Sequence, residues 1–120
     1  MNLNDDSNEL SWFSVGFQQA QKNRVTSGPG LYVIKKVNRV LGLPVSSVVL
    51  YVGRSKNLKR RFLQHLSPVS EHNQQLLTLS WEEELEFWFA EAPSDKLTRL
   101  ESLLIRQLEP IANISGTKGE

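Results

Sequence analysis

Two tyrosines, an arginine, a histidine and a glutamate are the side chains of this sequence best suited to handling charge and protons: Tyr32, Tyr51, Arg61, His65 and Glu101. Arg61 and His65 are four residues apart, so a helix would carry them on one side. The residues before them, an apolar run over 48–52 followed by Gly53, are typical of a buried strand and a close turn. An arginine and a histidine at the edge of a helix's apolar face indicate a binding site for an anion.

Glu101 falls inside the apolar stripe of the last predicted helix. That stripe repeats at helical spacing and consists of Leu97, Leu100, Leu104, Ile105 and Leu108. A carboxylate in such a position is destabilising by several kcal/mol unless a cation or a metal ion meets it. Two interpretations stay open. In the first, Glu101 is structural: it forms a salt bridge, for which Arg61 is the candidate, or its carboxylate reaches solvent. In the second, it is a ligand for a hard divalent cation.

The other candidates have ordinary structural explanations when each is taken alone. Tyr32 and Tyr51 on neighbouring strands are typical of core packing. A single helical histidine such as His65 is more often a packing or capping residue than a catalyst. Asn113, in a short segment after a proline, is typical of a turn. The combination of these residues, rather than any one of them, therefore points to a functional site.

Basic and acidic residues are distributed unevenly along the chain, although the formal net charge is only +1. Residues 10–70 contain ten lysines and arginines and no acid, whereas residues 71–120 contain ten acids and four basic residues. A surface built from the first half would be strongly positive, which favours a polyanionic partner. A basic surface that is merely solvated is the alternative.

The composition argues against several classes of protein. The sequence has no cysteine and two histidines, which excludes disulfides and thiolate metal sites and argues against a zinc site. No apolar run reaches the length of a membrane span, and the acidic N-terminus lacks the apolar core of a signal peptide. We therefore expect a soluble, cytoplasmic protein with no membrane partner.

The elements expected to position these residues form one α+β domain. Patterning predicts strands over 31–34, 48–52 and 85–89, and helices over 8–23, 58–67, 71–81 and 94–108. Residues 35–47, with Gly42 and Pro44, are typical of a long hairpin loop. The prediction is a small three-stranded antiparallel sheet flanked by helices, with an extra amphipathic N-terminal helix that packs on it.

Several short motifs occur together in an order that resembles the GIY-YIG nuclease superfamily. They are Gly30-Leu31-Tyr32, Tyr51-Val52-Gly53, Arg61 ten residues after the second tyrosine, His65 four further on, Glu101 in a late helix, and Asn113 after a proline. Residues 101–113 also resemble the nuclease domain in the C component of the bacterial excinuclease, and homing endonucleases share the signature. The resemblance covers residues 28–115, which would be the nuclease domain. Residues 1–27 would be a tail and helix, and residues 116–120 a frayed tail.

The resemblance implies a DNA endonuclease that uses one Mg²⁺ or Mn²⁺ ion and leaves 5′-phosphate and 3′-hydroxyl ends. Glu101 would hold the metal and Arg61 the phosphate, and Tyr32 would act as general base. Tyr51 and His65 would orient water and phosphate, whereas Gly30, Gly53 and Asn113 would shape the site. A further set of cations would grip the DNA backbone without reading bases: Arg54, Lys56, Lys59, Arg60, Lys35, Lys36 and Arg39.

The chain also departs from the family pattern. The two tyrosines are separated by a longer segment than is typical, and the first position after Gly53 is Arg54. No separate recognition domain is evident, so double-stranded or branched DNA would be engaged by a homodimer or together with a specificity subunit. Two alternatives remain: a catalytically silent module that binds nucleic acid or docks a partner, and a structural protein in which Glu101 and Arg61 simply pair.

Overall fold

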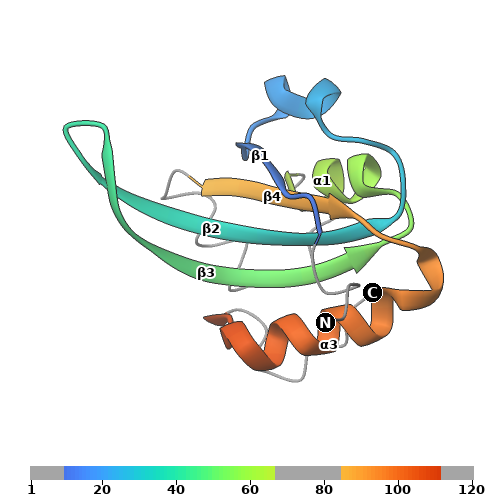
Figure 1. The fold of residues 1–120 in the computed structure, drawn as a ribbon. Helices are drawn as coiled ribbons and strands as arrows, with labels where there is room; N and C mark the ends of the chain where they lie inside the picture. Colours follow the sequence, from blue (N-terminus) through green and yellow to red (C-terminus); the bar gives the residue numbers. More distant parts are fainter. Residues whose placement is uncertain (1–9, 67–84, 112–120) are drawn as a thin grey trace.

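A four-stranded antiparallel sheet with the strand order β1-β4-β2-β3 forms the centre of the fold (Figure 1). The structure is a computed structural model that describes residues 10–66 and 85–111. The strands are β1 (Phe13–Gly16), β2 (Gly30–Val40), β3 (Leu43–Ser55) and β4 (Leu85–Glu91). The predicted α+β class with an antiparallel sheet is therefore confirmed, and the number of strands is corrected from three to four.

Two α-helices cover opposite faces of the sheet (Figure 1). The helix α1 (Leu58–Leu66) packs through Leu58 and Phe62 against a core that includes Tyr32. The helix α3 (Leu97–Leu108) packs through Leu97 and Leu100 against Leu31, on the opposite face, because successive strand side chains alternate. Both helices agree with the predicted ones, and α3 is preceded by a short 3₁₀ turn, η3 (Ser94–Lys96).

The predicted N-terminal helix over 8–23 is wrong. Within the described residues, Phe13–Gly16 forms the edge strand β1, and Gln19–Arg24 forms the 3₁₀ helix η2. The spacing of apolar residues suits a helix, but β1 pairs with β4, and Val15 and Phe17 are buried on the α1 face. Without β1, the backbone groups along that edge of β4 would lose their hydrogen-bond partners. The pairing of β1 with β4 therefore outweighs the helical spacing of the apolar residues. The predicted helix over 71–81 lies outside the described residues.

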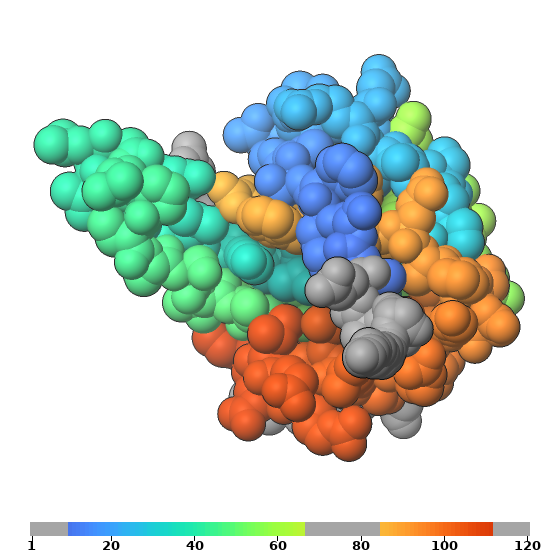
Figure 2. Space-filling model, in the orientation of Figure 1, coloured from blue at the N-terminus to red at the C-terminus, as the bar shows by residue number. Residues whose placement is uncertain are grey.

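The predicted loop over 35–47 is also wrong, because β2 and β3 continue through it. They meet at a tight turn in which Leu41 and Gly42 both have positive φ, at 52° and 86°. The strand β4 pairs with β2 only as far as Lys36, so residues 37–47 form a two-stranded ribbon that extends away from the body of the domain (Figure 2). We call this ribbon the arm. Pro44 is tolerated because β3 is an edge strand.

Candidate active site

Tyr32 lies at the centre of a hydrogen-bonded group that joins β2 to α1. Its phenol oxygen Oη is 2.7 Å from His65 Nε2 and accepts a hydrogen bond of 3.2 Å from Arg61 Nε. Tyr32 and His65 are buried, with exposed fractions of 0% and 3%. The rings of Tyr51 and His65 are also in edge contact, at a centroid distance of 5.3 Å. The structure thus brings together four of the five side chains that the sequence singled out.

The two predicted site-shaping glycines are required by close approaches. A Cβ on Gly53 would lie 2.4 Å from Tyr32 Cζ and Oη, because the tyrosine ring crosses directly over this glycine. A Cβ on Gly30 would lie 2.2 Å from the Ala90 carbonyl oxygen of β4. Gly30 therefore allows the sheet to close around the site, and Gly53 allows Tyr32 to reach Arg61 and His65.

Replacing Gly53 by alanine is expected to destabilise the protein by about 1–3 kcal/mol, because the fully buried Tyr32 ring has to shift. Denaturant unfolding of the variant measures this loss. Gly16→Ala is the matched control in the same sheet, since its nearest neighbour would be Gln18 Cδ at 4.0 Å. Equal stabilities of the two variants would contradict the steric role of Gly53.

Glu101 approaches the site from the opposite face of the sheet. It lies on α3 with an exposed fraction of 4%, as its place in the apolar stripe predicted. Arg54, the first residue after Gly53, donates a hydrogen bond from Nη1 to Glu101 Oε1. Arg54 was expected to contact DNA, and the structure shows it as a partner of the buried carboxylate. Arg61, the partner proposed from the sequence, donates to Tyr32 and to Gln64.

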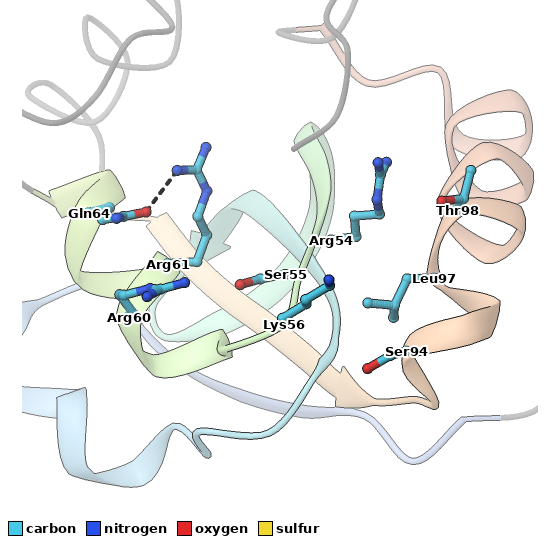
Figure 3. A pocket seen from close by; sticks show the side chains of 9 residues that line it. All are labelled: Arg54, Ser55, Lys56, Arg60, Arg61, Gln64, Ser94, Leu97 and Thr98. Carbon is cyan, nitrogen blue, oxygen red and sulfur yellow. Dashed lines mark hydrogen bonds between the residues drawn. The ribbon is translucent and has the colours of Figure 1, made fainter.

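A cavity of about 430 Å³ opens between α1 and α3 at the end of β3 (Figure 3). Figure 3 shows Arg61 and Gln64 on the α1 side and Thr98 on the α3 side, with the Arg54 guanidinium near Thr98. Nine described residues line the cavity, and none of them is acidic: Arg54, Ser55, Lys56, Arg60, Arg61, Gln64, Ser94, Leu97 and Thr98. Four cations around one cavity produce a strong local attraction for an anion such as a phosphodiester.

The donor set at Glu101 fits a hydrated divalent cation. Among the described residues, no group of three or more histidine, cysteine or acidic side chains could enclose a metal ion. A single carboxylate with water as the remaining ligands is a usual arrangement for Mg²⁺, which gives up its waters reluctantly. The contact with Arg54 shows that a positive group is accommodated at Glu101 Oε1. Glu101 is thus the described residue that would hold such an ion.

The predicted DNA-binding cations separate into two groups. Arg54, Lys56 and Arg60 line the cavity, and Lys59 is a partly exposed residue of α1 that does not line it. Lys35 and Lys36 lie on β2 at the base of the arm and Arg39 lies within it, and none of the three lines the cavity.

Arg39 and Lys35 each have a partner within the sheet. Arg39 Nη2 is 2.9 Å from Glu86 Oε2, and Lys35 Nζ lies 4.5 Å from the centre of the Trp88 ring. Burial raises the pKa of Glu86, but hydrogen bonds from Arg39 and Trp88 and the charges of Arg39 and Lys35 outweigh this effect, so the pKa is lowered from its ordinary value. The Glu86 carboxylate therefore remains ionised and attracts both cations within the sheet.

Some site residues were missed by sequence reasoning. Gln64 is three residues after Arg61 on α1, and this spacing could have identified it as a partner. Arg54 was predicted as a DNA-binding cation, but its pairing with Glu101 was missed. It follows Gly53 on a strand, so alternation places it on the α3 face. Strand alternation was visible in the sequence, but it predicts the pairing with Glu101 only when it is known which helix covers which face of the sheet. Ser94 and Thr98 had no signal, and Asn113 lies outside the described residues.

Taken together, the sheet, the two tyrosines in contact with His65 and the cationic cavity define a nuclease domain of the GIY-YIG superfamily. Residues 28–114 match the model of the UvrC-like GIY-YIG domain, and the chain belongs to this family. The predicted resemblance and enzyme class, a GIY-YIG type endonuclease, are thereby confirmed. None of the helices in the described part of the chain has the length and apolar character that crossing a bilayer demands.

Individual relatives agree with this assignment. Over 86 residues the chain is 34% identical to UvrABC system protein C of Aquifex aeolicus; the match covers 72% of this chain and 13% of that protein. Its fold is similar to the GIY-YIG N-terminal endonuclease domain of UvrC from Thermotoga maritima bound to magnesium, with 23% identity and a TM-score of 0.56. This match covers 80% of our chain and 94% of that one. A point mutant of the same domain gives 22% identity and a TM-score of 0.56.

Proposed function

We propose that this chain hydrolyses phosphodiester bonds in DNA with one divalent metal ion, Mg²⁺ or Mn²⁺, and leaves 5′-phosphate and 3′-hydroxyl ends. The observation that carries the proposal is one cationic cavity lined by two arginines with buried partners. Arg61 donates a hydrogen bond to Tyr32, and Arg54 donates one to Glu101. Membership of the UvrC-like family supports it. The magnesium bound to the Thermotoga maritima domain supports the choice of metal.

Arg61 would bind the scissile phosphate. Its side chain lines the cavity, and its Nε–H is already oriented by Tyr32 Oη, so the Nη groups can face the substrate. A guanidinium is always charged and forms paired hydrogen bonds with phosphate oxygens. The hydrogen bond from Arg61 Nη1 to Gln64 Oε1, at 2.8 Å, holds the guanidinium on the α1 side of the cavity.

Tyr32 would take a proton from the attacking water and pass its own to His65. Arg61 Nε–H donates to Tyr32 Oη, and the phenol hydrogen can then point at His65 Nε2, 2.7 Å away. A free phenol titrates near pH ~10, so a tyrosine base needs both nearby positive charge and an acceptor for its proton. An imidazole nitrogen without a hydrogen is such an acceptor. Tyr51, packed against His65, would keep the imidazole in place.

Glu101 would hold the metal ion, which when bound neutralises charge on the phosphate and on the departing 3′ oxygen.

Lys56, Arg60 and Lys59 would hold the flanking phosphates, and Lys35, Lys36 and Arg39 would contact more distant ones. Because these contacts carry no sequence information, specificity would come from a homodimer or from a separate subunit. Residues 28–115 would form the nuclease domain, with Asn113 supporting the site. A cytoplasmic location remains a prediction.

Nicking of supercoiled plasmid tests the proposal directly. With Mg²⁺ the purified protein is expected to convert supercoiled DNA to the nicked form, and EDTA is expected to stop this. Branched and linear duplexes measured in parallel identify the preferred substrate. Binding of plasmid without cleavage in Mg²⁺ and in Mn²⁺ would overturn the proposal and favour a catalytically silent DNA-binding module.

A further inference from the structure

The ion pair between Arg54 and Glu101 connects the proposed metal ligand to the cavity in which a substrate phosphate would bind. Arg54 contacts the carboxylate oxygen Oε1 and also lines the cationic cavity. Its side chain is 28% exposed, whereas that of Glu101 is 5% exposed. One flexible guanidinium therefore reaches both the buried acid and the open space in which a substrate phosphate would bind.

Arg54 and a divalent cation compete for the same carboxylate. A metal ion held by Glu101 would lie close to the Arg54 guanidinium, which donates a hydrogen bond to Oε1. Two positive groups at one carboxylate repel each other. Binding of either one must weaken binding of the other, and this coupling acts in both directions.

We infer that Arg54 is a displaceable counter-ion of Glu101: it neutralises the carboxylate when no metal is bound, and would become a phosphate ligand once a metal ion took over that role. This inference rests on the proposed function and adds a positioning role that links metal binding to substrate binding. The cavity wall gives the displaced guanidinium its new position, opposite Arg61 (Figure 3). Metal and phosphate then bind cooperatively, because each favours the same position of Arg54.

The inference predicts two opposite effects of the Arg54→Gln substitution. In EDTA the variant is expected to melt at a lower temperature than the wild type, because the buried carboxylate loses a positive partner. In Mg²⁺ its melting temperature is expected to rise by more than that of the wild type, because the competitor is gone. Calorimetric titration with Mg²⁺ alone is expected to show roughly tenfold tighter binding.

Two further variants make the test specific. Arg60→Gln removes a cation from the same cavity but not the contact with Glu101, so its Mg²⁺ affinity is expected to remain within about twofold of the wild type. The double variant Arg54→Gln/Glu101→Gln removes the buried charge and should fold in EDTA without binding Mg²⁺. Should the single variant Arg54→Gln fail to fold in EDTA, recovery of its folding on adding Mg²⁺ supports the inference. If Mg²⁺ does not restore its folding although the double variant folds, the inference is contradicted.

The outcome that would overturn the inference is an Arg54→Gln protein that is less stable in EDTA but binds Mg²⁺ no more tightly than the wild type. Arg54 would then be a purely structural partner. Plasmid nicking by the wild type, measured alongside, separates this failure from failure of the proposed function. A wild type that nicks DNA in Mg²⁺ while Arg54→Gln shows unchanged Mg²⁺ affinity removes only the role of Arg54.

Discussion

Replacing Glu101 by glutamine is expected to slow DNA cleavage by roughly 10³-fold, the size of effect seen when one main stabilising group of a transition state is lost. The amide keeps the shape of the side chain, and its oxygen can still accept a hydrogen bond from Arg54 Nη1. Folding should therefore survive, whereas an uncharged oxygen is a poor ligand for Mg²⁺. Single-turnover nicking, with melting temperatures measured in EDTA and in Mg²⁺, gives both quantities.

Glu109→Gln is the matched control for this substitution. It makes the same acid-to-amide change at the exposed C-terminal end of α3, away from the cavity-lining residues. Its nicking rate should equal that of the wild type. A Glu101→Gln protein that nicks at nearly the wild-type rate but unfolds much more easily would show that the carboxylate is a structural partner of Arg54 and not a metal ligand.

Replacing Tyr32 by phenylalanine is expected to lower the cleavage rate by about 10³-fold, within the range of general acid–base catalysis. The ring would remain packed against Phe87, whose centroid is 5.3 Å away, so the shape of the core is kept. Only Oη is removed, and with it the contacts to His65 Nε2 and Arg61 Nε. The loss of stability should be about 1–3 kcal/mol, since a buried hydrogen-bonding group is deleted.

Tyr51→Phe provides the comparison that assigns the base. If Tyr32 takes the proton, Tyr51→Phe should slow cleavage less than Tyr32→Phe does, and DNA affinity should be similar in the two variants. The reverse order of effects would transfer the role of general base to Tyr51. Nicking rates measured across pH for both variants identify the tyrosine whose removal changes the pH profile.

Local patterns predicted most of the parts that carry the site. Alternation of apolar and polar residues predicted β4, and the apolar run before Gly53 predicted the buried half of β3. Helical spacing of apolar residues predicted α1 and α3. The patterns failed where long-range pairing decides the conformation. Phe13–Gly16 satisfies a helical repeat, yet its backbone pairs with β4. Residues 35–47 contain a glycine and a proline, yet they continue the hairpin as an arm.

The sequence by itself determined that Gly30, Gly53 and Glu101 are unusual, because a glycine beside an apolar strand and a carboxylate in an apolar stripe each need a physical explanation. The tertiary structure alone decided which cation meets that carboxylate. Arg54 and Glu101 are 47 residues apart in the chain. They meet because strand alternation turns Arg54 away from Tyr32 and towards the face that α3 covers, and no local pattern records which helix covers which face.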